Sequence, residues 1–321
     1  MKLENEKPDV VCVGMSCADI MVPGLDLSLP LNEEMMTVEQ IPICVGGDAT
    51  NQSMVMAQLG LKTQLLTGVG KDVAGRLLED AVKAAGVDTS GFLRSGERPT
   101  SVTMIPISPE GTRKFVHIKF DSTACVFQPD VSYFQGARVV SLGSLMTPPL
   151  LDPAVAKNVI FAARKAGAVI CADVIYDGYG DVSFSDYGDG LREIDYFFPN
   201  DEEAEMITGK TDLDEMADAF LSYGIRHVVI KAGKQGCLFK SRTERFLEPA
   251  FVAKAVDTTG AGDNFASGFI TALLEGKSHR ECCRFAHAVA AIAVESVGAN
   301  VGVKSREQVE RFLSTHQQSK A

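Results

Sequence analysis

Short apolar runs alternate with longer stretches of helical periodicity along most of the chain. Apolar runs typical of buried strands occupy residues 9–14, 63–69, 138–142, 168–173, 195–198 and 226–231. Helical patterns occupy residues 49–59, 73–85 and 151–166, a stretch from about 201, two helices within 262–297, and 305–315. Strands that alternate with helices in this order predict right-handed βαβ units around a parallel sheet.

Two regions interrupt this rhythm and predict a small β appendage. Residues 101–107 and 112–118 alternate in polarity and flank Ser108-Pro-Glu-Gly111, which has the composition of a hairpin turn. Residues 18–45 contain short extended pieces that are broken by prolines. We therefore expect a single α/β domain over residues 1–321, with a β lid formed by about 18–45 and 98–120.

The charge and the apolar content of the chain exclude some classes of binding partner. The 321 residues include 42 acidic and 31 basic ones, and the net charge of −11 argues against a nucleic-acid or anionic-membrane surface. No apolar run approaches the ~20 residues that a membrane-spanning helix needs. The eight cysteines form no C-x-x-C pair, and no apolar signal region follows the charged start. We expect a cytoplasmic protein with small-molecule partners and neither a nucleic-acid nor a membrane partner.

The strongest chemical signal is the string Asp257-Thr-Thr-Gly-Ala-Gly-Asp-Asn-Phe265, between an extended segment and a helix. Gly260-Ala-Gly262 can bring successive backbone N–H groups close to a ligand, and a helix N-terminus adds partial positive charge, so the place suits a phosphate. Asp263 then lies in the first helical turn. Alone it would be a capping acid, but within this glycine loop it predicts a general base for a hydroxyl that attacks a phosphate.

Three weaker signals lie elsewhere in the chain. Gly46-Gly47 precede a helix that carries Asn51, which indicates a glycine turn or a close backbone approach to a small polar ligand. Asp19, five residues past the end of the first strand at Gly14, is either a solvated loop acid or an acceptor for sugar hydroxyls. Asn200 and Glu203 begin a helix, and they either cap it or hold a hydrated Mg²⁺.

Taken together, these strings resemble the ribokinase-like carbohydrate kinases of the phosphofructokinase-B (PfkB) family over nearly the whole chain. The glycine pair with Asn51 is similar to the first family signature, and Asp257 to Phe265 is similar to the second. Residues 198–203 match the family's Asn-x-x-Glu motif, and residues 284–299 are similar to the ribokinase C-terminal region. The resemblance implies a three-layer α/β/α core with a small β-sheet lid, and transfer of the ATP γ-phosphate to a hydroxyl of a small sugar or sugar acid.

The resemblance also implies roles for the matching residues. Asp263 would be the base, beside an anion hole of backbone N–H groups from Gly260, Ala261 and Gly262. The sugar would be held by Asp19, Gly46, Gly47 and Asn51. Mg²⁺ would be organised by Asn200 and Glu203, and the nucleotide would be bound near Lys231, Gly233 and His287. K⁺ would lie among Asp257, Thr259, Ala293, Ser296, Gly298 and Gly302, mostly on backbone carbonyls.

Some positions depart from ribokinase itself. Cys17 stands where ribokinase has Asn, Asp48 stands where it has Lys, and Gly143-Ser144 lie near the place of an acidic residue. Ribose is therefore not implied as the substrate. Arg98 and Arg113, in or near the predicted lid, either contact an acid or phosphate on the substrate or are solvated charges.

Two other functions stay open at this point. A nucleoside kinase on the same scaffold would need a wider apolar lid pocket, and Met36, Met104 and Phe120 would either line that pocket or pack as the core of the lid. A non-catalytic sugar or nucleotide sensor would be marked by the loss of Asp263 or of the glycines, which are intact. Exposed edges of lid strands also predict a homodimer in which two lids pair.

Overall fold

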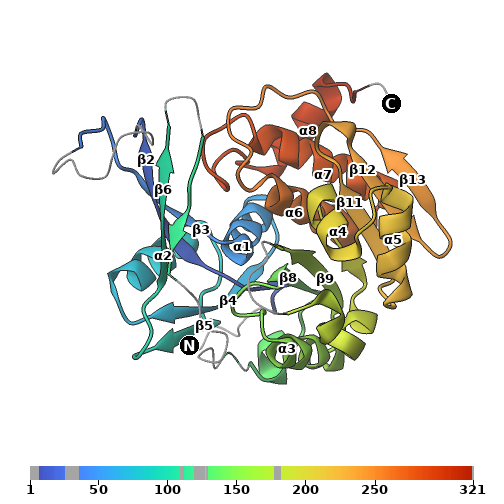
Figure 1. Ribbon diagram of the computed structural model, residues 1–321, viewed down its shortest axis with the longest axis horizontal. Coiled ribbons are helices and arrows are strands. Elements are labelled where there is room, and N and C mark those ends of the chain that lie inside the picture. Colours follow the sequence, from blue (N-terminus) through green and yellow to red (C-terminus); the bar gives the residue numbers. More distant parts are fainter. Residues whose placement is uncertain are drawn as a thin grey trace.

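A mainly parallel sheet of nine strands forms the centre of the computed structural model, which describes residues 7–25, 36–108, 112–118, 127, 129–176 and 182–319 (Figure 1). Its strands are β1 (Val10–Val13), β4 (Thr63–Gly70), β5 (Phe92–Ser95), β8 (Val139–Leu145), β9 (Val169–Val174), β10 (Tyr196–Phe197), β11 (His227–Lys231), β12 (Cys237–Ser241) and β13 (Arg245–Glu248). They lie in the order β13-β12-β11-β10-β9-β8-β1-β4-β5. β11, β12 and β13 pair antiparallel, whereas the other neighbours pair parallel, as the βαβ rhythm predicts.

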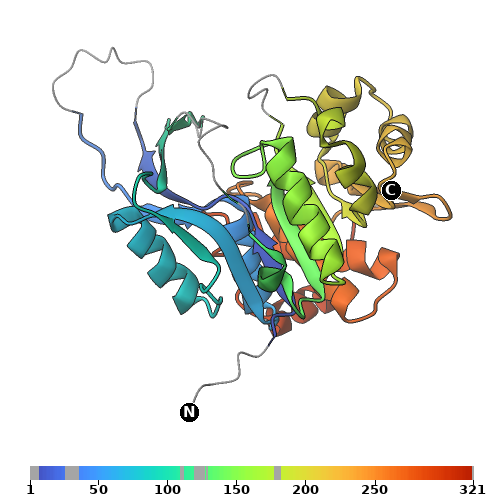
Figure 2. The same cartoon turned by 90° about the horizontal axis from the view of Figure 1, so that it is seen from below.

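Helices cover both faces of this sheet. They are α1 (Asp48–Gln58), α2 (Val73–Ala84), α3 (Pro153–Lys165), α4 (Asp201–Thr208), α5 (Leu213–Ser222), α6 (Ala261–Leu274), α7 (His279–Ala293) and α8 (Arg306–Thr315). Viewed from below, α3 lies in green along one face of the sheet (Figure 2). Among the described helices, none is both long and apolar enough to cross a membrane.

The alternation of side chains along β1 explains the three layers. Val10 and Cys12 join an apolar cluster with α1, α2, α6, α7 and α8, whereas Val11 and Val13 join a second cluster with α3, α4 and α5. Each residue of β1 is fully buried, because helices cover the strand on both sides. The fold class expected from the sequence is therefore confirmed.

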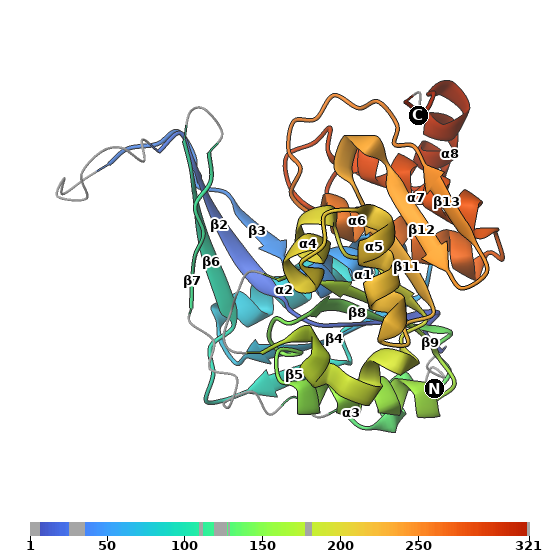
Figure 3. The same ribbon diagram turned by 45° about the vertical axis from the view of Figure 1, so that its right-hand side comes forward.

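A second, four-stranded sheet projects from this core, and we call it the lid (Figure 3). Its strands, in the order β3-β2-β6-β7, are β3 (Ile43–Gly46), β2 (Cys17–Pro23), β6 (Ser101–Ile107) and β7 (Val116–His117). The predicted hairpin is present as the antiparallel pair β6 and β7, and the bridge between Ile107 and Arg113 continues the same register. The hairpin tip at 109–111 and Phe120 lie outside the described residues.

Sequence periodicity does not predict every element. β5 is a short edge strand with a polar end, and the hairpin of β12 and β13 adds antiparallel strands after the last predicted one. The pattern from residue 201 contains two helices, because Gly209 ends α4 in a left-handed conformation with φ 66°. Asp212 then caps α5 through hydrogen bonds to two backbone N–H groups.

Candidate active site

The loop before α6 has the geometry that the glycine string predicts. Gly260 adopts a left-handed conformation with φ 72°, and α6 begins at the next residue. A side chain at Gly260 would place its Cβ 2.5 Å from Ala299 Cβ, so the close approach requires glycine. Asp263 therefore lies in the first turn of α6, 7% exposed, next to N–H groups that have no acceptor within the helix.

Two amides from α1 hold the carboxylate of Asp263. Asn51 Nδ2 donates to Oδ2 at 2.8 Å, and Gln52 Nε2 donates to Oδ1 at 3.3 Å. Each amide is oriented in turn, because Asn300 Nδ2 donates to Asn51 Oδ1 at 2.9 Å and Ser141 Oγ donates to Gln52 Oε1 at 2.7 Å. Groups from three separate parts of the chain therefore fix the orientation of this carboxylate.

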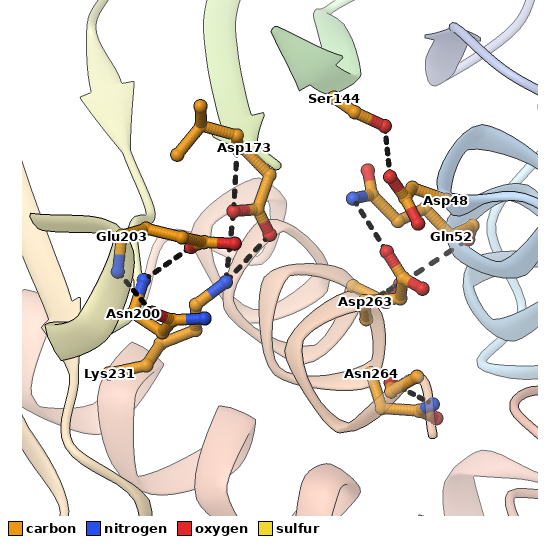
Figure 4. A network of polar contacts seen from close by, with 12 residues as sticks. Asp48, Gln52, Ser144, Asp173, Asn200, Glu203, Lys231, Asp263 and Asn264 are labelled. Atoms are coloured by element: carbon orange, nitrogen blue, oxygen red, sulfur yellow. Dashed lines mark hydrogen bonds and ion pairs between the residues drawn. The ribbon is translucent and has the colours of Figure 1, made fainter. Parts of the chain in front are cut away.

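A second acid, Asp48, faces the same space from the first turn of α1 (Figure 4). It accepts a hydrogen bond from Ser144 Oγ. Burial raises the pKa of Asp48 to about 7, against the effect of that hydrogen bond. Burial, with the charge of Asp48 next in importance, also raises the pKa of Asp263 well above its usual range. A carboxylate with a raised pKa holds a proton more strongly, which suits a general base.

An ion pair lies on the opposite side of this space (Figure 4). Lys231 Nζ, at the end of β11, lies 2.9 and 2.8 Å from the two carboxylate oxygens of Asp173, near the end of β9. Burial lowers the pKa of Lys231, but Asp173 and Glu203 outweigh burial, so the pKa is raised and the amine stays cationic. A Cβ on Gly262 would lie 3.0 Å from Lys231 Nζ, which places this cation beside the glycine loop at the start of α6.

Asn200 and Glu203 form a reciprocal cap at the start of α4. Glu203 N donates to Asn200 Oδ1 at 2.7 Å, and Asn200 N donates to Glu203 Oε2 at 2.8 Å. Burial raises the pKa of Glu203 to about 7, although Lys231 lowers it. No described group of three or more His, Cys, Asp or Glu side chains is arranged to hold a metal ion. A Mg²⁺ ion that keeps several waters and takes one or two protein oxygens fits this pair.

One cavity of about 840 Å³ joins these groups. Its walls include these predicted residues: Asn200, Glu203, Lys231, Gly233, Gly260, Ala261, Gly262, Asp263 and His287. His287, on α7, is 6% exposed, and its Nε2 has no hydrogen-bond partner in the described structure. A polar ligand in the cavity could supply that partner. Asp48, Asp173 and Gly143 also line it, whereas the predicted sugar contacts Asp19, Gly46, Gly47 and Asn51 do not.

Asp19 lies on strand β2, so it is not a loop acid. β3 pairs with β2 and brings Gly46 beside this side chain, where a Cβ on Gly46 would lie 2.2 Å from Asp19 Oδ2. Gly47 follows with φ 92° and leads into α1, which carries Asn51. Burial raises the pKa of Asp19. The structure thus brings all four predicted sugar contacts to the base of the lid and the start of α1.

Two of the predicted monovalent-ion positions, Thr259 and Gly298, contact the side chain of Asp257. Thr259 N donates to its Oδ1 at 2.8 Å, and Gly298 N donates to its Oδ2 at 2.9 Å. Arg113 reaches this loop from the lid, with Nη2 2.9 Å from Asp257 Oδ1 and Nη1 donating to Thr259 Oγ1. Burial raises the pKa of Asp257, but the two backbone donors and Arg113 outweigh it, so the pKa lies below its usual value. Arg113 is therefore paired with groups of the protein. The sequence predicts that it either contacts an acid or phosphate on the substrate or is a solvated charge.

Several site residues do not stand out in the sequence. Gln52 and Ser141 are ordinary polar residues within a helix and a strand, and only their packing against Asp263 gives them a role. Asn300 follows the last predicted helix pair and reaches Asn51 through tertiary contact. Asp173 could have been found, because it lies near the carboxyl end of a buried parallel strand, and ligands bind at that edge of the sheet.

Comparisons with known proteins identify the family of this chain. The model of the pfkB family carbohydrate kinases matches residues 7–306. A 2-dehydro-3-deoxygluconokinase from Bacillus subtilis (strain 168) is 31% identical over 285 residues, which cover 84% of this chain and 86% of that protein. A ribokinase from Haemophilus influenzae is 29% identical over 295 residues, with 87% and 90% covered.

Solved structures share the fold of this chain. The Arabidopsis thaliana ribokinase complexed with ribose and ATP has a TM-score of 0.84 and 27% identity, covering 96% of this chain and 99% of that one. Thermotoga maritima ribokinase has a TM-score of 0.80 and 25% identity, with 96% and 100% covered. The two-sheet fold, the family model and the named kinases agree, and the chain belongs to the pfkB family of carbohydrate kinases, as a phosphotransferase that acts on a sugar hydroxyl.

Proposed function

We propose that the protein transfers the γ-phosphate of ATP to a hydroxyl of a small sugar or sugar acid, with Asp263 as the general base. The observation that carries this proposal is the placement of Asp263. Its buried carboxylate lines the cavity, is held by Asn51 and Gln52, and lies in the turn of α6 that follows Gly260. A positioned base of raised pKa, beside a helix N-terminus that attracts phosphate, is what phosphoryl transfer to an alcohol requires.

Asp263 and the groups around it would each contribute to the transfer of the phosphoryl group. The carboxylate accepts the proton of the attacking hydroxyl, so that the oxygen becomes a better nucleophile. The N–H groups of Gly260, Ala261 and Gly262 stabilise the negative charge that spreads over the phosphoryl oxygens. Lys231, fixed by Asp173 next to Gly262, adds positive charge to the same region.

Nucleotide and metal would occupy the side of the cavity that faces α4 and α7. Gly233 and His287 line this part, and the unpartnered Nε2 of His287 supports a polar ligand there. Asn200 and Glu203 would hold Mg²⁺ through water, and the bound ion supplies charge neutralisation for the phosphates. The related Arabidopsis ribokinase is described as complexed with ribose and ATP, which supports ATP as the donor.

The acceptor would lie between Asp263 and the base of the lid. Asp19, Gly46, Gly47 and Asn51 come together there, and carboxylates and amides bind hydroxyl groups well. The related kinases are named for ribose and for a deoxy sugar acid, so both classes of acceptor belong in the test.

The outer face of the lid supports a homodimer. Ile43, Ile20, Met104 and Val116 are successive cross-strand partners and form one apolar row across all four lid strands. Ile43, Met104 and Val116 are 57%, 45% and 57% exposed. Side chains alternate along β2, so this row lies on the face opposite to Asp19 and the sugar. A second copy of the chain that pairs its lid with this one would cover the row.

We also propose a cytoplasmic location. All seven cysteines within the described residues are free thiols, and most of them are buried. Free buried cysteines are typical of proteins from reducing compartments.

The test is ADP formation from ATP and Mg²⁺ across a panel of pentoses, hexoses, sugar acids and nucleosides. The proposal expects one substrate class to be turned over by the wild type and not by Asp263→Asn. That variant should still bind ATP, as measured by a thermal-shift assay. Nucleotide binding without turnover of any compound would instead favour a sensor, and turnover of nucleosides alone would favour a nucleoside kinase.

A further inference from the structure

The side chain of Arg113 reaches from the lid to the loop that precedes α6. Strand register explains this reach. Ile107 bridges to Arg113 and Thr103 pairs with His117, which is one continuous antiparallel ladder. Residues that differ by an even number share a face of a strand, so Arg113 lies on the inner face with His117, and Lys114 lies on the outer face. The arginine therefore faces the site rather than the solvent.

Arg113 makes two specific polar contacts with the loop before α6. Its two terminal nitrogens engage the carboxylate of Asp257 and the hydroxyl of Thr259. The Arg113 side chain is 25% exposed and that of Asp257 is 1% exposed, so the pair is screened from water on the acid side. Because the guanidinium engages two oxygen atoms at once, its orientation is fixed more strongly than in a single surface ion pair.

These contacts conflict with the K⁺ site that the family resemblance implies. Asp257 is the one charged residue of the six implied positions, and its carboxylate already accepts two backbone N–H bonds and the guanidinium. Two of the carbonyls also accept hydrogen bonds, from Ser296 N to Ala293 O and from Gln308 Nε2 to Gly302 O. A monovalent cation added here would meet a carboxylate whose charge is already balanced.

We propose that Arg113 supplies, from the lid, the positive charge that balances Asp257 beside the anion hole, and that the protein does not need K⁺. Arg113 is then a positioning residue, because it holds the Asp257–Thr259 segment that leads into Gly260. Without it, an uncompensated carboxylate would lie close to an incoming phosphate and would repel it. The charge argument stands on the contacts alone, whereas its effect on turnover rests on the proposed kinase function.

The experiment compares K⁺, Na⁺ and choline salts at matched ionic strength, in the wild type, Arg113→Ala and Lys114→Ala. Lys114 is a suitable control because it is the adjacent lid cation on the outer face. The first readout is the melting temperature, which needs no substrate. We expect K⁺ and choline to give the same value for the wild type and Lys114→Ala, and K⁺ to raise it for Arg113→Ala, where Asp257 is free to bind a cation.

The second readout is kcat with the substrate found above. We expect Arg113→Ala in choline to lose about tenfold, less than the about hundredfold typical of a direct oxyanion donor, and K⁺ to restore part of the loss. Arg113→Lys should keep the insensitivity to K⁺, and Arg113→Gln replaces the alanine variant if that one fails to fold. A wild type that K⁺ stabilises or activates would overturn the proposal, as would an Arg113→Ala variant that ignores K⁺ in both readouts. If no substrate is turned over, the melting temperatures alone decide the question.

Discussion

The amide of Asn51 donates a hydrogen bond of 2.8 Å to the carboxylate of Asp263, although the two residues are 212 positions apart. This bond joins α1 to α6 and holds the proposed base against the first turn of its helix. It stabilises the ionised carboxylate and thereby opposes the burial that raises the pKa of Asp263. The pair therefore sets both the orientation and the proton affinity of the base.

Removal of the Asn51 amide should move the pH profile. In Asn51→Ala the pKa of Asp263 rises further, so a smaller fraction of the base is ionised at neutral pH. The acid limb of kcat/KM should shift to higher pH by about one unit, since a hydrogen bond to a charged group contributes about 1.5–3 kcal/mol. Ser267→Ala is the control, because Ser267 Oγ donates to the backbone carbonyl of Asp263 and does not touch its carboxylate. An unshifted profile in Asn51→Ala would contradict this account.

Ionisation of the Asp48 carboxyl should lower the free energy of unfolding as the pH rises. Burial raises its pKa from 3.8 to about 7, so the folded state resists ionisation, and the cost grows from about pH 4 to pH 7 and is complete above that. Asp48→Asn should therefore stabilise the protein more at pH 8 than at pH 5, by about 1–3 kcal/mol. Urea unfolding at both pH values measures the difference. An equal effect at the two values would show that Asp48 titrates normally.

Gly260 should tolerate alanine much less well than Gly276 at the other end of α6. Both glycines are left-handed, with φ 72° and 76°, but only Gly260 has a neighbour in the way, at 2.5 Å. Gly276→Ala should cost about 1–2 kcal/mol from backbone strain alone. Gly260→Ala should cost about 1–3 kcal/mol more from overlap with Ala299. Chemical denaturation of the two variants gives the comparison, and equal losses would refute the steric argument.

A charge in the apolar row of the lid should prevent dimer formation. Met104→Glu places a carboxylate in the middle of that row, where pairing with a second lid would bury it. Sedimentation at micromolar concentration should show a dimer for the wild type and a monomer for this variant. Phe161→Glu is the control, because Phe161 is 40% exposed on α3, which packs against the central sheet and not against the lid. A monomeric wild type would exclude the proposed dimer.

Local signals explain which parts of this structure can be predicted from sequence. The strands of the parallel core are short and mostly apolar, and Gly260 and Asn200 act within a few residues of their own position, as a tight turn and a helix cap. The partners of Asp263 cannot be found in the same way, because Gln52 and Asn300 acquire their roles only when distant elements pack together. Arg113 is the clearest case, since its sequence context resembles any solvated hairpin charge.

Direct observation of phosphoryl transfer tests the central claim, that Asp263 takes the proton of the acceptor hydroxyl. The measurement is ³¹P NMR of ATP, Mg²⁺ and the sugar identified by the substrate panel, with wild-type protein and with Asp263→Asn. The account predicts that the γ-phosphate signal is replaced by that of a sugar phosphate monoester, and that Asp263→Asn slows this by about 10²–10⁴-fold while it still binds ATP. A folded Asp263→Asn variant that forms the monoester at a rate close to the wild type would contradict the account.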